Sequence, residues 1–229
     1  MREGREPVAR AGLKLLDEAG LEGLTLRAIA AELGVQAPTL YWRFRNKQDL
    51  VDEMASQVLA DYAMRLLETE PRPQTWPQWA RLCARELRGQ LLRYRDGARM
   101  VAGSHLKETS VYALMETMLG AFAAAGIAPT DAAICLKTIH DYVIGFTIEQ
   151  QAMALAAGAG GTRHVLDVRE AQLDRHLYPL AHSIGAALFA DYDRVFDRGV
   201  GIIIAGFASS LPRRSKAWLD FRAESEDGA

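Results

Sequence analysis

A chain of 229 residues is long enough for one large or two modest domains with a substantial apolar core. With 49% hydrophobic and 24% charged residues, the composition excludes a disordered chain, and a net charge of −2 excludes a polycation, so any contact with nucleic acid must come from a local basic patch. The two cysteines, Cys83 and Cys135, lie far apart without a CxxC pair, which argues against a disulfide scaffold and a zinc site and fits a reducing compartment.

The chain begins with a charged stretch that has no apolar region behind it, so we expect no signal peptide. Its longest apolar run, residues 200–207, is far shorter than the about 20 residues that a membrane-spanning helix requires. We therefore expect a cytoplasmic protein without a membrane partner.

The first 67 residues predict four helices. Apolar residues spaced three and four apart give the first helix one buried face, and Gly20 is expected to end it. Thr25 is a plausible N-cap of the second helix, Gly34 ends it, and Asn46 is a plausible cap of the fourth. The predicted helices are 6–19, a second that follows Thr25, a short third from about 37 to 44 or 45, and a long fourth that runs to about 67.

The remaining chain is also expected to be helical. Three prolines place a linker at about 68–77, residues 156–162 read as a flexible segment, and the chain after 211 reads as a polar, frayed tail. The predicted helices are 78–94, 108–125, 129–157, 168–188 and 191–210. The fold class is therefore all-α, with four parts in chain order: an N-terminal helix-turn-helix domain (1–47), a connecting helix (48–67), a larger ligand-binding and dimerisation domain (68–211) and a polar tail (212–229).

The segment 25–47 carries the functional signal, because two short helices joined by a tight turn form a helix-turn-helix. In such a motif the second helix enters the major groove of DNA with its N-terminal residues at the base edges. Between Arg27 and Lys47 the sequence has four basic residues and one acid, Glu32, so the segment carries a charge of +3. This is the local basic patch that the composition requires.

Individual side chains of this segment suit different parts of DNA. Gln36 suits an adenine edge, Arg27 suits a guanine, and Ala37 with Pro38 offers only apolar contact to a thymine methyl. Contacts to phosphates are expected from Thr39, Tyr41, Trp42 and Lys47. Further positive charge comes from Arg43 and Arg45. Two alternatives stay open: one of Tyr41 and Trp42 is expected in the core, and the basic residues also fit a solvated face.

Four short strings of this region together resemble the N-terminal signature of the tetracycline-repressor (TetR) family. They are GLEGLT at 20–25, LGV at 33–35, PTLYW at 38–42 and NK at 46–47. The resemblance implies a homodimer that binds operator DNA through this region. It also implies DNA contacts at the matching positions, which are Arg27, Gln36, Ala37, Pro38, Thr39, Tyr41, Trp42 and Lys47. The tetracycline repressor has a glutamine where this chain has Ala37, so the operator sequence need not be the same.

The likeness continues into the larger domain, which is similar to the sensing domain of the tetracycline repressor. The similar parts are the segments 91–99, 148–151 and 202–207, and Gly145. In that repressor, polar residues that bind a magnesium–drug chelate fall at Ala63, Cys83 and Val101 of this chain. Because all three are apolar or weakly polar here, we predict that magnesium–tetracycline is not the ligand and that a more apolar effector is. The predicted pocket residues are Leu66, Cys83, Leu87, Val101, His105, Leu106, Met118, His140 and Asp141.

The last two predicted helices each carry a stripe of apolar residues. These residues could pack into the domain's own core, or they could form a four-helix bundle between two copies of the chain. We expect both, since two consecutive helices offer more apolar surface than one small core can bury. The predicted interface residues are Leu177, Ile184, Leu188, Phe196, Val200, Ile203 and Phe207. A two-fold dimer must place its recognition helices about 34–36 Å apart, so the operator should be near-palindromic.

An enzyme that uses His140, Asp141 and Glu149 is the main rival, but the sequence has no nucleophile motif, phosphate-binding loop or metal cluster. We therefore expect no catalytic residues, no metal site and no cofactor. His140 and Asp141 also fit ordinary hydrogen-bonded helix residues, and His176 and His182 make a poor metal pair. A regulator of the same fold without a small-molecule effector, or one that activates transcription, stays open.

Overall fold

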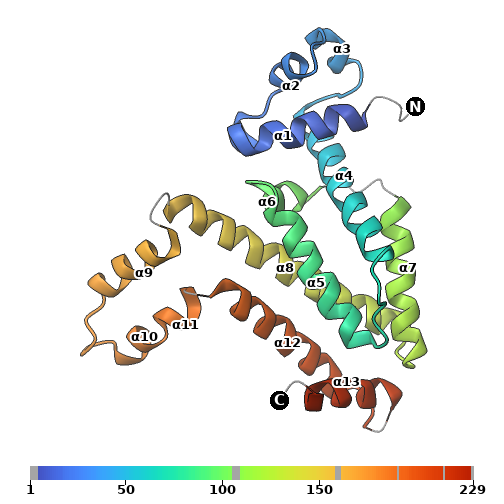
Figure 1. Ribbon diagram of the computed structural model, residues 1–229, viewed down its shortest axis with the longest axis vertical. Coiled ribbons are helices and arrows are strands. Elements are labelled where there is room, and N and C mark those ends of the chain that lie inside the picture. The colour runs from blue at the N-terminus through green and yellow to red at the C-terminus, as the bar shows by residue number, and fades with distance from the viewer. Residues whose placement is uncertain (1–4, 105–108, 158–160, 190, 214, 228–229) are drawn as a thin grey trace.

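The computed structural model describes residues 5–104, 109–157, 161–189, 191–213 and 215–227, and these ranges contain helices and no strand (Figure 1). The predicted all-α fold is confirmed. The helices are α1 (Glu6–Gly23), α2 (Leu26–Glu32), α3 (Ala37–Tyr41), α4 (Lys47–Leu67), α5 (Trp76–Leu92), α6 (Gly97–Val101), α7 (Thr109–Ala124), α8 (Pro129–Ala157), α9 (Gly161–Gln172), α10 (Pro179–Ser183), α11 (Gly185–Phe189), α12 (Tyr192–Ser210) and α13 (Lys216–Asp227).

Helices α1–α3 and the start of α4 form a small unit at the top of Figure 1. The predicted caps are confirmed, because the Thr25 side chain accepts the amide of Ala28 at 3.1 Å and the Asn46 side chain accepts the amide of Asp49 at 2.8 Å. Gly34 adopts a φ of +65°, which glycine supplies at little steric cost in the turn after α2. The core of this unit is the fully buried set Leu16, Leu24, Ile29, Leu40, Phe44, Leu50 and Met54.

Helix α4 is the continuous connection between this unit and the larger one. Its first turns pack against α1, and the helix also packs against α5, α6 and α7 (Figure 1). Residues along its whole length are buried, from Leu50 to Leu66. A helix shared by two cores transmits a displacement from one to the other because its backbone hydrogen bonds make it stiff.

A second connection runs from the turn between α5 and α6 to the C-terminal end of α1. Helix α1 kinks at Gly20, with a φ of +67°, instead of ending there as predicted, and the kink exposes amide groups of its last turn. The buried Asp96 carboxylate accepts one of them. Four contacts form this clamp, namely Leu21 N to Asp96 Oδ2 at 2.8 Å, Arg95 N to Asp17 Oδ1 at 2.8 Å, Arg95 Nη1 to the carbonyl of Glu18 at 3.2 Å and Arg99 Nη2 to Glu22 Oε1 at 3.2 Å.

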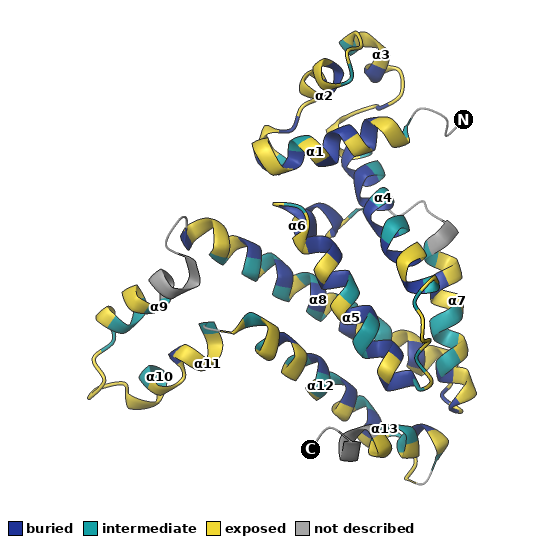
Figure 2. Ribbon diagram, in the orientation of Figure 1, coloured by how far each residue is buried: buried dark blue, intermediate teal, exposed yellow. Residues whose placement is uncertain are grey.

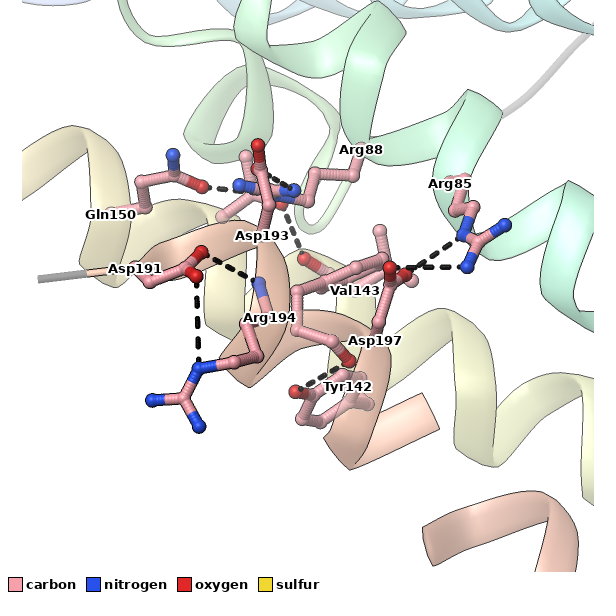
Figure 3. Close-up of polar contacts among 11 residues, drawn as sticks. Arg85, Arg88, Tyr142, Val143, Gln150, Asp191, Asp193, Arg194 and Asp197 are labelled. Atoms are coloured by element: carbon pink, nitrogen blue, oxygen red, sulfur yellow. Dashed lines mark hydrogen bonds and ion pairs between the residues drawn. The ribbon is translucent and has the colours of Figure 1, made fainter. Parts of the chain in front are cut away.

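The larger unit is built on α5, α8 and α12, which pack against one another (Figure 1). Arg88 of α5 joins all three helices, because it donates to Gln150 of α8 at 3.0 Å and pairs with Asp193 of α12 at 2.7 Å (Figure 3). Its guanidinium also lies 4.8 Å from the ring centre of Phe196. Arg85, one turn earlier, holds Asp197 through two hydrogen bonds of 2.8 and 3.0 Å.

The predicted single helix over 168–188 is wrong, because this stretch contains the end of α9, a turn, and the short helices α10 and α11. The Asp174 side chain accepts the amides of His176 and Leu177, which closes a turn in place of helical hydrogen bonds. Pro179 then disfavours helical geometry at Tyr178, whose φ and ψ are −129° and 57°. We call residues 173–189 the arm.

The C-terminal segment, predicted to be a frayed tail, forms α13, which packs against α5 and α12. The Trp76 indole donates to the carbonyl of Ala217 at 2.9 Å, and the Lys216 ammonium donates to the carbonyl of Ala124 at 3.0 Å. Trp76 itself belongs to an aromatic cluster with Phe122 and Phe207. In the described ranges, no helix has the length and hydrophobicity that crossing a bilayer demands.

Candidate nucleic-acid interface and ligand cavity

Helix α3 is held from one side and exposed on the other. Leu40 and Phe44 are buried in the core of the small unit, whereas Gln36, Pro38 and Thr39 face solvent. Figure 2 shows exposed residues over the outer surface of α2 and α3, at the tip of the molecule farthest from α12. The helix is therefore presented outward, as a recognition helix must be.

Tyr41 and Trp42 are both exposed, with 54% and 90% of their surface accessible. The expectation that one of the two packs in the core is wrong, because the core positions at this end of α3 are taken by Leu40 and Phe44. Two adjacent exposed aromatic side chains form a contiguous apolar patch, and such a patch favours a binding role.

The other predicted DNA-contacting residues lie on the same unit. Arg27, Arg43 and Lys47 are exposed, and Ala37 is half-buried against the core. The Lys47 ammonium donates to the carbonyl of Glu22 at 3.0 Å and so caps the end of α1. Glu32, the one acid of the segment, is paired with Lys14 and its negative charge is locally balanced.

Arg5 supports this surface from behind and was not among the predicted residues. Its guanidinium lies 4.5 Å from the ring centre of Phe44, pairs with Asp49 at 3.0 Å, and donates to the carbonyl of Arg43 at 3.1 Å. It therefore fixes the end of α3 against the start of α4. A basic residue before the first helix is a weak signal, since its partners are about 40 residues away in the sequence.

The larger unit contains a cavity of about 330 Å³ between α4, α5, α7 and α8. This volume lies within the usual range for a small-molecule site. Its walls are mainly aliphatic and thioether side chains. The lining residues are Leu59, Tyr62, Cys83, Ala84, Leu87, Val111, Leu114, Met115, Met118, Leu119, Ala133, Leu136, Lys137, Ile139, His140 and Val143.

Four predicted pocket residues line this cavity: Cys83, Leu87, Met118 and His140. Leu66 and Val101 are buried but do not line it, and Asp141 is exposed and paired with Lys137, so these three predictions are wrong for this cavity. His105 and Leu106 lie outside the described residues. The α7 wall was missed, although its apolar residues at 111, 114, 115, 118 and 119 have helical spacing.

Two of the polar groups in the cavity wall are already satisfied. The buried Tyr62 hydroxyl donates to the carbonyl of Cys83 at 3.3 Å, and burial raises the pKa of Tyr62 well above its ordinary value. The Cys83 thiol donates to the Met118 sulfur at 3.0 Å, and burial raises the pKa of this thiol to about 12. A thiol with so little thiolate at neutral pH is a poor redox switch, so Cys83 serves as apolar wall.

Comparison with known proteins agrees with this geometry. The model of bacterial regulatory proteins of the tetR family matches residues 9–54, and the model of the tetracyclin repressor-like C-terminal domain matches residues 70–211. The chain belongs to the TetR family. It is 37% identical to the class A tetracycline repressor protein from transposon 1721 of Escherichia coli, over 88% of each chain.

Solved structures of TetR-family proteins share the fold. A possible TetR family transcriptional regulator from Streptomyces coelicolor A3(2) superposes with a TM-score of 0.77 and 32% identity, covering 90% of this chain and 100% of that one. A class A TetR in complex with 5a,6-anhydrotetracycline and magnesium has a TM-score of 0.62 and 30% identity, covering 88% and 96% of the two chains. The chain is therefore a ligand-responsive DNA-binding repressor that acts as a homodimer, and it is not an enzyme.

The predicted interface residues of this TetR-family chain fall into two groups. Phe196 and Val200 are 1% and 2% exposed and belong to the core of the protomer, so their assignment to the surface between two copies is wrong. Ile203 and Phe207 are half-buried and pack against the same core. Leu177, Ile184 and Leu188 are exposed along the arm, and Figure 2 shows much of this part of the chain in yellow.

Other apolar side chains face outward on the two long helices. Ile202 of α12 is 63% exposed and Leu155 of α8 is 49% exposed, and neither was predicted. Close to Ile202, Ala205 and Gly206 are exposed as well, so a second helix can approach the backbone closely. The outward face of α12, centred on Ile202, is therefore an apolar surface with room for a second helix.

Proposed function

We propose that an apolar small molecule binds the cavity between α4, α5, α7 and α8 and releases this repressor from a near-palindromic operator. The observation that carries the proposal is the composition of the cavity wall, which includes Leu59 and Tyr62 of α4. Any molecule that fills the cavity therefore touches α4, which is separated from the recognition helix by only five residues.

The release mechanism follows from the two connections between the units. A ligand that is bound more tightly in one position of α4 than in another shifts the protein toward the favoured position. The displacement reaches α1–α3 through α4 itself, and the clamp of Asp96 on α1 couples the same unit to the turn after α5. Because two recognition helices must fit successive major grooves about 34–36 Å apart, a small rotation of each unit weakens binding.

A class A TetR binds 5a,6-anhydrotetracycline with magnesium. We infer that a magnesium–tetracycline chelate fits the cavity of this chain poorly. The polar lining side chains among the described residues are Tyr62, Cys83, Lys137 and His140, and none is a carboxylate. The position that corresponds to a metal-binding histidine holds Val101, which is 6% exposed and does not line the cavity. A hydrated dication would lose its water without gaining oxygen ligands, so we infer an apolar effector.

The remaining parts of the proposal concern DNA and location. We infer that Arg27, Gln36, Ala37, Pro38 and Thr39 lie toward the bases, whereas Tyr41, Trp42, Arg43 and Lys47 lie toward phosphates. The exposed surface of α3 and the +3 charge of segment 25–47 support this assignment. Since the operator is chromosomal or plasmid DNA, we infer that the protein works in the cytoplasm.

The experiment compares the wild-type chain with Leu136→Trp against a panel of lipophilic drugs and metabolites. Leu136 is half-buried and lines the cavity, so an indole at this position occupies the space of a ligand. We expect Leu136→Trp to bind the operator as the wild type does and to lose at least tenfold in affinity for cavity ligands. Calorimetry measures the ligand affinity, and fluorescence anisotropy of a labelled operator measures release.

The matched control is Ile134→Trp, which adds the same indole on the exposed side of α8. This variant should respond as the wild type does. Compounds that bind the wild type but do not bind Leu136→Trp are the cavity ligands. The proposal fails if all of these compounds leave the complex of the wild type with the operator intact. That result would favour a regulator controlled without a small-molecule effector.

A further inference from the structure

Among the described residues, His140 has no hydrogen-bond partner, and in this it differs from the other polar side chains of the cavity. Tyr62 donates to the carbonyl of Cys83, the Cys83 thiol donates to Met118, and the Lys137 ammonium bonds Asp141. The His140 ring lines the cavity and makes no hydrogen bond to any residue in the part of the chain that the structure describes. Three polar groups are therefore satisfied within the protein, and one is left for a ligand.

The surroundings of His140 keep its ring uncharged at neutral pH. Burial lowers the pKa of this histidine, and the nearby charges of Asp141 and Lys137 act in opposite directions. The side chains next to it in the cavity wall, Leu136, Ile139 and Val143, carry no charge. An uncharged imidazole has one N–H donor and one nitrogen acceptor, and it satisfies both only with a polar partner.

We propose that the effector is an uncharged, largely apolar molecule with one hydroxyl group, and that His140 bonds this hydroxyl. The inference rests on the proposed function, since it concerns the same cavity. A hydroxyl matches the imidazole whichever ring nitrogen carries the proton, because it both donates and accepts. A carboxylate or ammonium group would lose its hydration among the aliphatic side chains without an opposite charge to pair with, as Lys137 and Asp141 already neutralise each other.

The cavity favours such a molecule because a ligand without a hydroxyl leaves the His140 ring without a hydrogen bond, which costs binding free energy. A hydrocarbon of the same size displaces water from the ring and gives no hydrogen bond in return. A hydroxyl restores the bond that the water provided. The net advantage of one such neutral hydrogen bond in a buried site corresponds to about tenfold in affinity.

The test uses 2-naphthol and 2-methylnaphthalene, which differ by a hydroxyl in place of a methyl group, and measures their binding to the full-length chain by equilibrium dialysis. His140→Phe keeps a flat ring without hydrogen-bonding groups, and His140→Gln keeps both a donor and an acceptor. We expect His140→Phe to weaken 2-naphthol about tenfold and to leave 2-methylnaphthalene unchanged or tighter. His140→Gln should bind 2-naphthol within about threefold of the wild type.

The outcomes separate the two proposals. If both compounds bind the wild type and His140→Phe changes the two affinities by the same factor, the role of His140 is refuted while the apolar cavity stands. If neither compound binds, or if Leu136→Trp binds both as the wild type does, the cavity is not the ligand site and both proposals fall. Unaltered operator binding and thermal unfolding of the His140 variants show that they are folded.

Discussion

Replacing Tyr41 and Trp42 together by alanine is expected to abolish operator binding at physiological salt while the fold is unchanged. Both side chains are largely exposed, and Trp42 is 90% accessible, so the protomer loses little packing. If each side chain contributes about 1 kcal/mol to DNA binding, two residues in two protomers contribute about 4 kcal/mol, which is roughly a thousandfold in affinity. Fluorescence anisotropy with a labelled operator measures this loss.

The matched control is Tyr112→Ala, because Tyr112 is 64% exposed on α7, far from the recognition helix. This variant should bind the operator as the wild type does. Equal operator affinities of the double variant and the wild type would mean that the exposed aromatic pair beside α3 does not touch DNA.

Placing an arginine at Ile202 is expected to convert the dimer into monomers. Ile202 is 63% exposed near the middle of α12, beside the exposed small residues Ala205 and Gly206. In a two-fold interface the substitution appears twice, and each buried unpaired charge costs about 3 kcal/mol. The dissociation constant of the dimer should rise by roughly ten-thousandfold, and operator binding should fall with it.

Sedimentation velocity across a range of protein concentrations measures this change. The control is Leu219→Arg, which places the same charge on α13 at a side chain that is 52% exposed. A dimeric Ile202→Arg protein would show that the outward face of α12 is not the interface, and the exposed arm would then be the better candidate.

The parts of the fold that the sequence predicts well are those decided by local chemistry. Thr25 and Asn46 cap their helices because their side chains bond amides three residues away, and Gly34 turns the chain because it lacks a Cβ. The sequence also predicts which residues anchor α3, since Leu40 and Phe44, four residues apart, are both buried. The two aromatics between them illustrate the limit, because hydrophobicity alone does not tell a binding residue from a core residue.

The parts that were predicted wrongly depend on distant partners. The stripes containing Leu177 and Phe196 look alike in sequence, yet Leu177 is exposed and Phe196 is buried against Arg88 of α5 and Tyr142 of α8. Pro179 is a local signal against a continuous helix over 168–188, and apolar spacing alone does not reveal the break. Which side of α4 faces the cavity is set by how α5, α7 and α8 pack, so Leu59 and Tyr62 line it while Leu66 does not.

The central claim is that two copies of the exposed helix α3 bind DNA together at a fixed separation. Selection of bound duplexes from a random library by the purified full-length protein tests it most directly. We predict enrichment of an inverted repeat whose half-site centres lie about one helical turn, or a multiple of it, apart. Recovery of a single unpaired half-site, or no enrichment even in low salt, would contradict the account.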